Sequence, residues 1–221
     1  MLGLELFYRA GGFACVNPIL LEHLMLHRSA SASTAHERTS GQAEAIAQQH
    51  ALAAGDVLLC ISNSGANVVA IELARIARTR GLAVIALVSA KHATSAQCRA
   101  NPDSAAGGSS QHVADTAPDN LMDCADVILD NHGEPGDAAT SIGGEGGSQA
   151  RADLATLPLM GATSTVVGAA LVNAVAVRTA ELMVGAGHAD AVDVFISANV
   201  KGGDAHNERL IAKYIDRVEA L

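Results

Sequence analysis

Residues 57–88 carry the sequence pattern that most constrains how this chain can fold. Two short apolar runs, Val57–Ile61 and Ala83–Val88, have the length and composition of buried strands. Between them, Asn67–Arg80 has the period of an amphipathic helix, and Gly81 marks its end. A strand, a helix and a strand within about 30 residues make a βαβ unit, in which the two strands run parallel. The sequence therefore predicts an α/β protein with a parallel sheet.

Weaker patterns predict the rest of the chain. Apolar periodicity indicates helices over residues 1–10, 42–53, 161–184 and 207–218, and strands over residues 126–129 and 193–196. Small polar residues and glycine indicate flexible loops near 29–40, 101–112 and 141–151. The length of 221 residues suits a single α/β domain.

Charge and hydropathy limit the classes of partner. The net charge is −9, whereas a protein that binds the phosphate backbone of nucleic acid needs a basic surface. The longest apolar run, Val166–Val177, contains Asn173 and is shorter than the roughly 20 residues that span a bilayer. Glu5 and Arg9 interrupt the first apolar stretch, unlike the core of a secretory signal. We therefore expect a soluble, cytoplasmic protein without nucleic-acid or membrane partners.

The turn Ser62–Asn67, between the first strand and the helix of the βαβ unit, is the candidate binding site. Small hydrogen-bonding side chains occupy most of it, and Gly65 has no Cβ to keep a ligand from the backbone. A helix N-terminus adds unpaired N–H groups and a partial positive charge, which together favour a phosphate. The alternative is a plain helix cap. The candidate phosphate-binding residues are Ser62, Asn63, Ser64, Gly65 and Asn67.

Residues 61–67 (ISNSGAN) and their flanking strands resemble the signature of the sugar isomerase (SIS) domain. Further segments resemble one SIS subfamily close to the phosphoheptose isomerases: residues 6–12 (LFYRAGG), 163–168 (TSTVVG) and 197–208 (SANVKGGDAHNE). The resemblance implies a single SIS domain over residues 1–221, folded as a three-layer αβα sandwich of the flavodoxin-like, doubly wound kind. It also implies a phosphorylated sugar as the ligand.

The resemblance extends to the start of the chain, where this sequence differs from the subfamily. Members begin with a helix and a first strand that ends in a turn similar to Gly-Thr-Gly-His-Ser. This sequence begins just after that turn, and no capping residue precedes its first helix. We expect either a truncated sequence or a protein that lacks one strand and one wall of the sugar site.

Two residues are candidates for acid–base chemistry. Aldose–ketose isomerisation needs a base that moves a proton between adjacent carbons and a second group that moves the hydroxyl proton. In phosphoheptose isomerases a Glu and a late His do this, and the resemblance places Glu5 and His206 at these positions. Asp204 and Glu208 would hold the His206 tautomer and raise its pKa. The alternatives are a solvent-facing Glu5, and a His206 that only follows Asp204 as helix cap.

Three hydroxyl residues open the long apolar helix, where they either cap it or contact the sugar. Together with Asp204, they are the candidate sugar-binding residues: Thr163, Ser164 and Thr165. The apolar face of residues 165–184 predicts a homodimer or homotetramer. Cysteine and histidine are not clustered, and the pair His23 and His27 is too small for a metal site, so we expect no metal or other cofactor.

The sequence thus predicts a phosphosugar-binding protein that acts as a sugar-phosphate isomerase. A non-catalytic sugar-phosphate sensor is the alternative, because SIS domains also serve in regulators.

Overall fold

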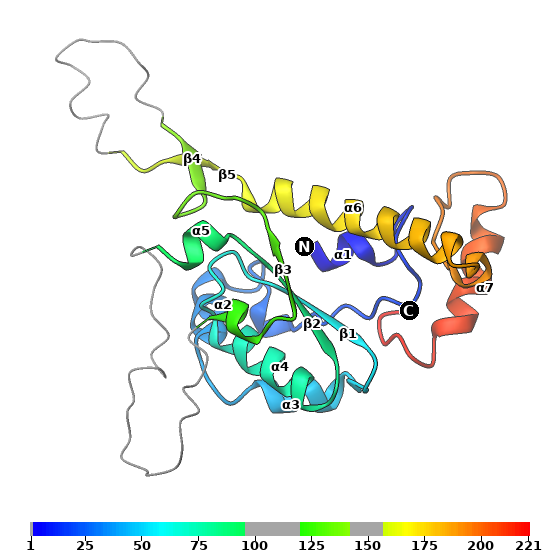
Figure 1. Cartoon of the computed structure of the whole chain (residues 1–221), viewed down its shortest axis with the longest axis horizontal. Helices are drawn as coiled ribbons and strands as arrows, with labels where there is room; N and C mark the ends of the chain where they lie inside the picture. Colours follow the sequence, from blue (N-terminus) through cyan, green and yellow to red (C-terminus); the bar gives the residue numbers. More distant parts are fainter. Residues whose placement is uncertain (1, 96–119, 142–156) are drawn as a thin grey trace. The chain divides into compact units, whose positions relative to one another are not determined.

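The computed structural model describes residues 2–95, 120–141 and 157–221 (Figure 1). The chain divides into two compact units. Unit 1 comprises Met1–Arg28 and Thr165–Leu221, and unit 2 comprises Ser29–Ser164. The predicted loop at 101–112, and residues 142–151 of the one at 141–151, lie outside the described residues.

Unit 2 contains a parallel sheet of three strands, in the order β1 (Val57–Ile61), β2 (Ala83–Val88) and β3 (Val127–Asp130). Ile85 in the central strand lies between Leu59 of β1 and Val127 of β3. The predicted parallel α/β fold is confirmed, and the first two strands have the predicted bounds.

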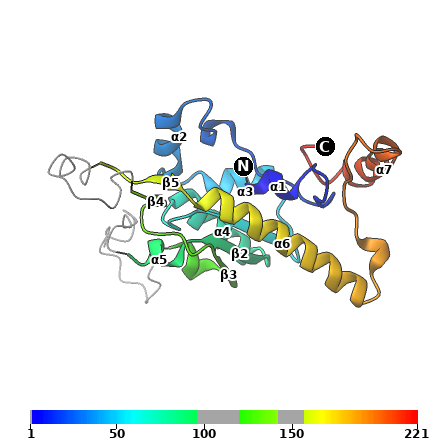
Figure 2. The same cartoon turned by 90° about the horizontal axis from the view of Figure 1, so that it is seen from above.

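Helix α4 (Val68–Thr79) connects β1 to β2 and packs against both strands and against α3 (Ala43–Gln49), as Figures 1 and 2 show. Its buried residues include Val69, Leu73 and Ala77, which are spaced by four and therefore share one face. With so few aromatic residues, the core of this unit is aliphatic: Leu58, Val84, Ala86, Leu87, Val88 and Leu121 are all buried.

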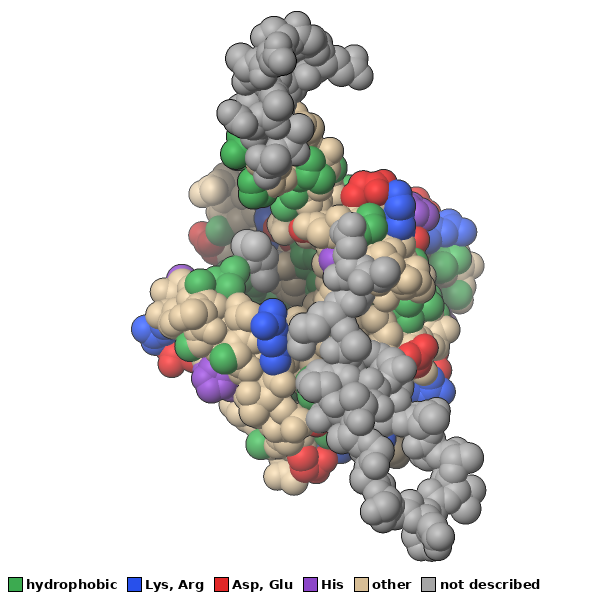
Figure 3. Space-filling view, turned by 90° about the vertical axis from the view of Figure 1, so that its left-hand side faces the viewer, with side chains coloured by type: hydrophobic (Ala, Val, Ile, Leu, Met, Phe, Trp, Pro, Cys, Tyr) green, Lys and Arg blue, Asp and Glu red, His purple; other side chains and the backbone are tan. Residues whose placement is uncertain are grey.

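The remaining elements of unit 2 include two that the sequence did not predict, the paired strands β4 (Ala138–Thr140) and β5 (Met160–Ala162). Two short helical elements were also not predicted, α5 (Ala90–Ala93) and the 3₁₀ helix η3 (Leu121–Cys124). On the face drawn in Figure 3, Lys and Arg side chains are scattered singly, often beside Asp or Glu.

The predicted loop at 29–40 is wrong, because Ala30–Glu37 forms helix α2. Ser29 caps it by accepting a hydrogen bond from the Ala32 N–H, and Thr34 Oγ1 donates to the Ala30 carbonyl. Only Ser33 of this helix is buried. An exposed helix with no apolar stripe has no periodicity to detect, so its polar composition resembles that of a loop.

Unit 1 contains α1 (Leu2–Leu6), the 3₁₀ helices η1 (Glu22–Leu24) and η6 (Ala189–Ala191), and α7 (Gly203–Tyr214). The strand predicted at 193–196 is reduced to an antiparallel bridge between Phe13 and Val194, supported by hydrogen bonds between residues 11–14 and 193–195. Ala14, Phe195 and Leu210 form the buried core of this unit.

Helix α6 (Ser164–Gly185) confirms the predicted long helix. Gly168, Val172 and Ala176 are its buried residues, whereas Val166 and Val177 are exposed. Within the described ranges, it is the one helix long and apolar enough to cross a membrane, judged by length and composition. The core helices of soluble proteins pass the same test, so this property is weak evidence for a membrane span.

Candidate functional site

The candidate site lies at the carboxyl ends of the three parallel strands. Ser62 and Asn63 follow β1, Ser89 follows β2, and Asn131 follows β3. The carboxyl ends of parallel strands lie along one edge of a sheet, which is where α/β proteins bind ligands. The turn that the sequence identified is therefore one part of a polar edge to which three strands contribute.

Ser62 has a buried hydroxyl with no hydrogen-bond partner in the described part of the chain. The residue is 8% exposed, and its backbone is fixed because its N–H donates to Leu87 O and its carbonyl accepts from the Gly65 N–H, both at 3.0 Å. A buried polar group left unpaired costs about 1–3 kcal/mol, so such groups normally have a partner. The unpaired hydroxyl of Ser62 is therefore a candidate contact for a bound group.

Gly65 is required by the fold of the turn itself. Its φ of +65° lies in the left-handed region, and a Cβ at this position would overlap the side chain of Asn120. Asn120 Nδ2 donates to the Ser64 carbonyl at 3.0 Å, and the Leu121 N–H donates to the Gly65 carbonyl at 2.8 Å. The absence of a side chain thus allows η3 to dock on the turn, in addition to any access it gives a ligand.

The N-terminus of α4 lacks the plain side-chain cap that was the alternative interpretation of this turn. Asn67 is at the capping position, but its side chain makes no capping bond and Nδ2 instead donates to Glu37 Oε2 at 3.0 Å. Ser64 Oγ accepts from the Ala66 N–H at 3.3 Å. The N–H groups of Val68 and Val69, in the first helical turn, have no acceptor within the helix. Backbone donors therefore remain for an anion.

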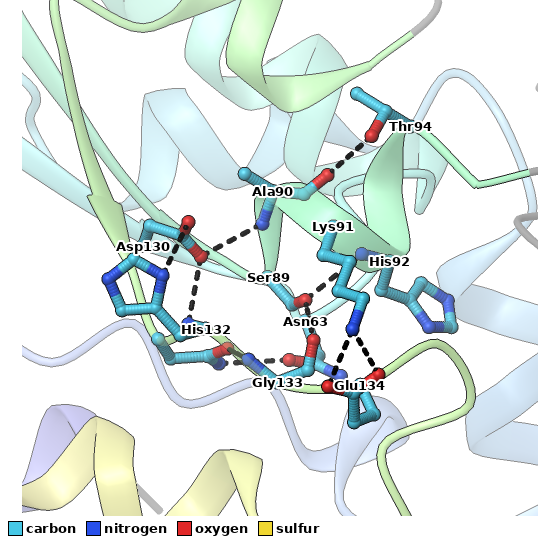
Figure 4. Close-up of polar contacts among 11 residues, drawn as sticks. Asn63, Ser89, Ala90, Lys91, His92, Thr94, Asp130, His132, Gly133 and Glu134 are labelled. Atoms are coloured by element: carbon cyan, nitrogen blue, oxygen red, sulfur yellow. Dashed lines mark hydrogen bonds and ion pairs between the residues drawn. The ribbon is translucent and has the colours of Figure 1, made fainter.

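A chain of hydrogen bonds joins the strand ends (Figure 4). Asn131 Nδ2 donates to Asn63 Oδ1, and Asn131 Oδ1 accepts from the Gly133 N–H, both at 2.9 Å. The hydroxyl of Ser89 donates to the Gly133 carbonyl at 2.6 Å, and the Ser89 N–H donates to the Asn63 carbonyl at 2.9 Å. These contacts fix the position of Asn63.

Charged side chains surround this network. Asp130 accepts hydrogen bonds from the Ala90 N–H at 3.0 Å and from the His132 N–H at 2.9 Å. Lys91 and Glu134 form an ion pair, which Figure 4 shows on the other side of the view from Asp130. Partial burial would raise the pKa of Asp130, but the two backbone hydrogen bonds and the nearby His132 ring lower it below its ordinary value. Asp130 is therefore ionised at neutral pH.

Asp137 caps α6 and engages two of the three hydroxyl residues predicted there. Its Oδ1 accepts from the Thr163 N–H at 3.1 Å and the Ser164 N–H at 2.8 Å, and the Ser164 hydroxyl donates to Oδ2 at 2.6 Å. Burial opposes ionisation, but these bonds lower the pKa of Asp137. The Ser164 hydroxyl thus belongs to the cap, whereas Thr165 is exposed.

His206 lies in the first turn of α7 with both ring nitrogens engaged. Nε2 is 2.9 Å from the Val194 carbonyl, and Nδ1 is 3.2 Å from Arg209 Nη2. A carbonyl only accepts, so Nε2 carries the proton in this arrangement. The expected contacts to Asp204 and Glu208 are wrong: among the described residues neither carboxylate bonds the ring. The capping position of α7 is Gly202, and Asp204 is exposed.

Glu5, the other predicted catalytic residue, lies on α1 and forms an ion pair with Arg9 at 2.5 Å. No hydrogen bond or ion pair joins Glu5 to His206 in the part of the chain that the structure describes. Both belong to unit 1, and the Ser62–Asn67 turn belongs to unit 2. No group of three or more His, Cys, Asp or Glu that would hold a metal occurs among the described residues.

Sequence reasoning missed the contributions of Ser89, Asn120 and Asn131 to this site. Ser89 and Asn131 had a detectable signal, because each follows the last residue of an apolar strand. Asn120 had none, since its role depends on its approach to Gly65 from a distant part of the chain.

Comparison with known proteins agrees with this geometry. Residues 1–89, which contain β1, α4, β2 and the Ser62–Asn67 turn, match the family model of the SIS domain. The protein is thus an α/β protein whose first 89 residues match the SIS domain, a domain that supports binding of carbohydrate derivatives.

Relatives that match almost the whole chain show that it belongs to the UPF0309 family. A UPF0309 protein of Listeria monocytogenes serotype 4b is 36% identical over 217 residues, which cover 98% of this chain and 76% of the relative. UPF0309 proteins of Listeria innocua and Brucella anthropi are similar to the same extent.

Proposed function

We propose that this protein binds a phosphorylated sugar, with the phosphate at the Ser62–Asn67 turn. The observation that carries the proposal is the buried hydroxyl of Ser62, which has no partner among the described residues. It lies at the carboxyl edge of a parallel sheet and just before a helix whose first N–H groups have no acceptor within the helix. The SIS-domain match supports the same class of ligand.

The phosphate would be held by neutral donors. Ser62 supplies a hydroxyl and Asn63 a side-chain amide, while backbone N–H groups of the first turn of α4 donate along the helix axis. Ser64 and Gly65 shape the turn, and Asn67, whose amide is engaged by Glu37, contributes its backbone. The partial positive charge of the helix N-terminus offsets part of the phosphate charge. Thr163, Thr165 and Asp204 stay proposed contacts of the sugar, and Ser164 contacts it only if its cap bond to Asp137 opens.

In its catalytic form, the proposal makes Glu5 and His206 the proton carriers of an aldose–ketose isomerisation. For either residue to act, an existing contact must open: the ion pair of Glu5 with Arg9, or one of the two ring contacts of His206. If no sugar phosphate opens these contacts, the second candidate function is favoured, in which the protein is a sugar-phosphate sensor without catalysis.

Proton NMR in D₂O distinguishes these functions. The protein is incubated with a panel of hexose 6-phosphates and heptose 7-phosphates. An isomerase exchanges the C1 or C2 proton of its substrate, so that signal disappears, and Glu5→Gln and His206→Asn prevent the loss. A sensor broadens the signals of its ligand without exchange. If no sugar phosphate shows either effect, the proposed function is wrong.

We further propose that the protein is a homo-oligomer, at least a dimer, and that α6 forms the contact. Val166, Val177 and Val184 are all more than half exposed, and their spacing places them along one stripe of the helix. Such a stripe of valines is stabilised when a second copy covers it.

A further inference from the structure

We infer that Asn131 is a positioning residue that turns the side chain of Asn63 into a phosphate donor. The inference rests on the proposed function, because it assigns to Asn131 the orientation of a group that contacts the phosphate. Asn131 itself hydrogen-bonds to the side chain of Asn63 and is not proposed to contact the phosphate.

A backbone group of fixed polarity sets the orientation of the Asn131 amide. The Gly133 N–H can only donate, so the side-chain atom of Asn131 that faces it at 2.9 Å must be the carbonyl oxygen Oδ1. The opposite orientation of this amide would bring its NH₂ group against the backbone N–H. Asn131 must therefore direct its Nδ2 the other way, toward Asn63.

The orientation of the Asn63 amide is fixed in the same way. Since Asn131 presents N–H groups, Asn63 must present its own Oδ1 to them, at 2.9 Å. The Nδ2 group of Asn63 then has no partner among the described residues. The amide of Asn63 is thus left with two donors and no choice of orientation. A donor in this turn suits an anion, whereas the flipped amide would offer an oxygen and repel one.

These hydrogen bonds form a relay from Gly133 through Asn131 to Asn63, and its starting point is held rigidly. Asn131 is 4% exposed and Gly133 is buried, so water does not compete for their bonds. The carbonyl of Gly133 accepts from Ser89 Oγ at 2.6 Å, which ties the far end of the relay to β2. Ser89 Oγ also accepts a hydrogen bond from the His92 N–H at 3.0 Å, and Figure 4 shows these contacts. Aligned hydrogen bonds strengthen one another, so the relay also increases the donor strength of Asn63.

A double-mutant cycle separates positioning from a general loss of structure. Four proteins are titrated by calorimetry with the tightest-binding sugar phosphate of the panel: the natural chain, Asn63→Ala, Asn131→Ala and the double variant. If Asn131 acts through Asn63, each single change lowers affinity about tenfold, and the double variant binds no more weakly than Asn63→Ala. Gln48→Ala, in which an exposed amide on α3 is removed, is the matched control and leaves affinity unchanged.

Asn131→Asp keeps the size and shape of the side chain and reverses the relay. Its carboxylate still accepts the Gly133 N–H but cannot donate, so Asn63 turns its amide toward the carboxylate and presents its oxygen to the phosphate. The ¹H–¹⁵N signals of the Asn63 side chain report this directly. They shift when sugar phosphate is added to the natural chain, and in Asn131→Asp they already differ without ligand and do not respond.

Two results would overturn the inference, and they are distinguishable. If the natural chain binds and Asn131→Ala weakens binding equally with and without Asn63, then Asn131 does not act through Asn63. If the natural chain binds no sugar phosphate, the proposed function fails and the inference fails with it.

Discussion

Ser62 and Ser64 occupy the same turn, yet their hydroxyls have different surroundings. The Ser64 hydroxyl accepts from the Ala66 N–H, whereas the Ser62 hydroxyl is buried and has no partner in the described structure. One side chain thus stabilises the turn, and the other is stabilised only when something binds.

The two serines should therefore respond differently to substitution. Ser62→Ala removes a buried hydroxyl that makes no bond, so the free energy of unfolding should stay equal or rise by about 1 kcal/mol in the absence of ligand. Ser64→Ala removes a real bond and should lower it by about 0.5–1 kcal/mol. Urea unfolding of both variants in phosphate-free buffer measures the difference. Equal destabilisation by both changes would mean that Ser62 also has a structural partner.

At the scale of elements, the cap of α6 comes from a distant residue. Asp137 has φ of +69°, a conformation that Asp tolerates better than most side chains, and this places its carboxylate at the first amides of the helix. The Thr-Ser-Thr sequence indicated either a cap or a sugar contact, and the acceptor in the observed cap is a carboxylate that precedes the helix by more than twenty residues.

Asp137→Asn keeps the shape of the side chain and removes its charge. At pH 7 it should lower the free energy of unfolding by about 1 kcal/mol. The pKa of Asp137 is lowered in the folded state, so its stabilisation is complete above the unfolded pKa of about 4 and is lost as pH falls through the folded value. Thermal unfolding from pH 7 to pH 2.5 should show the two proteins converging. Asp216→Ala, at an exposed carboxylate, is the control; a constant difference at all pH values would contradict this account.

The exposed stripe of α6 leads to a prediction about assembly. Val177→Glu places a charge on a valine that is 61% exposed, so it should leave folding within about 0.5 kcal/mol while disrupting a contact between copies. Light scattering after gel filtration should give at least a dimer for the natural chain and a monomer for the variant. Asn173→Asp, on the same stripe of α6, should perturb the contact between copies less than Val177→Glu. A natural chain that is monomeric at all concentrations would refute the proposed contact.

At the scale of the whole molecule, the sequence predicted the elements that have strong local patterns. The bounds of β1 and β2 match the apolar runs, and α4 lies within one residue of its predicted range at each end, because buried strands and amphipathic helices have distinct periods. It did not predict α2 or the β4–β5 pair, which have little buried apolar surface. The single domain over residues 1–221 stays a prediction.

The candidate site was only partly predictable for a related reason. The Ser62–Asn67 turn is contiguous, so its composition is visible in the sequence. The relay from Gly133 through Asn131 to Asn63 depends on the register of three strands, which no local pattern specifies. Likewise, the contacts of His206 to Val194 and Arg209 differ from the carboxylate contacts expected from its sequence neighbours.

The central claim is that a phosphorylated sugar binds at the Ser62–Asn67 turn, and calorimetric titration tests it most directly. The natural chain and Ser62→Ala are each titrated with one sugar phosphate and with the same sugar lacking phosphate. We predict heat of binding only for the phosphorylated sugar, and an affinity at least about tenfold lower in Ser62→Ala, which corresponds to one hydrogen bond to a charged group. Binding that does not depend on the phosphate, or that Ser62→Ala leaves unchanged, would contradict the account.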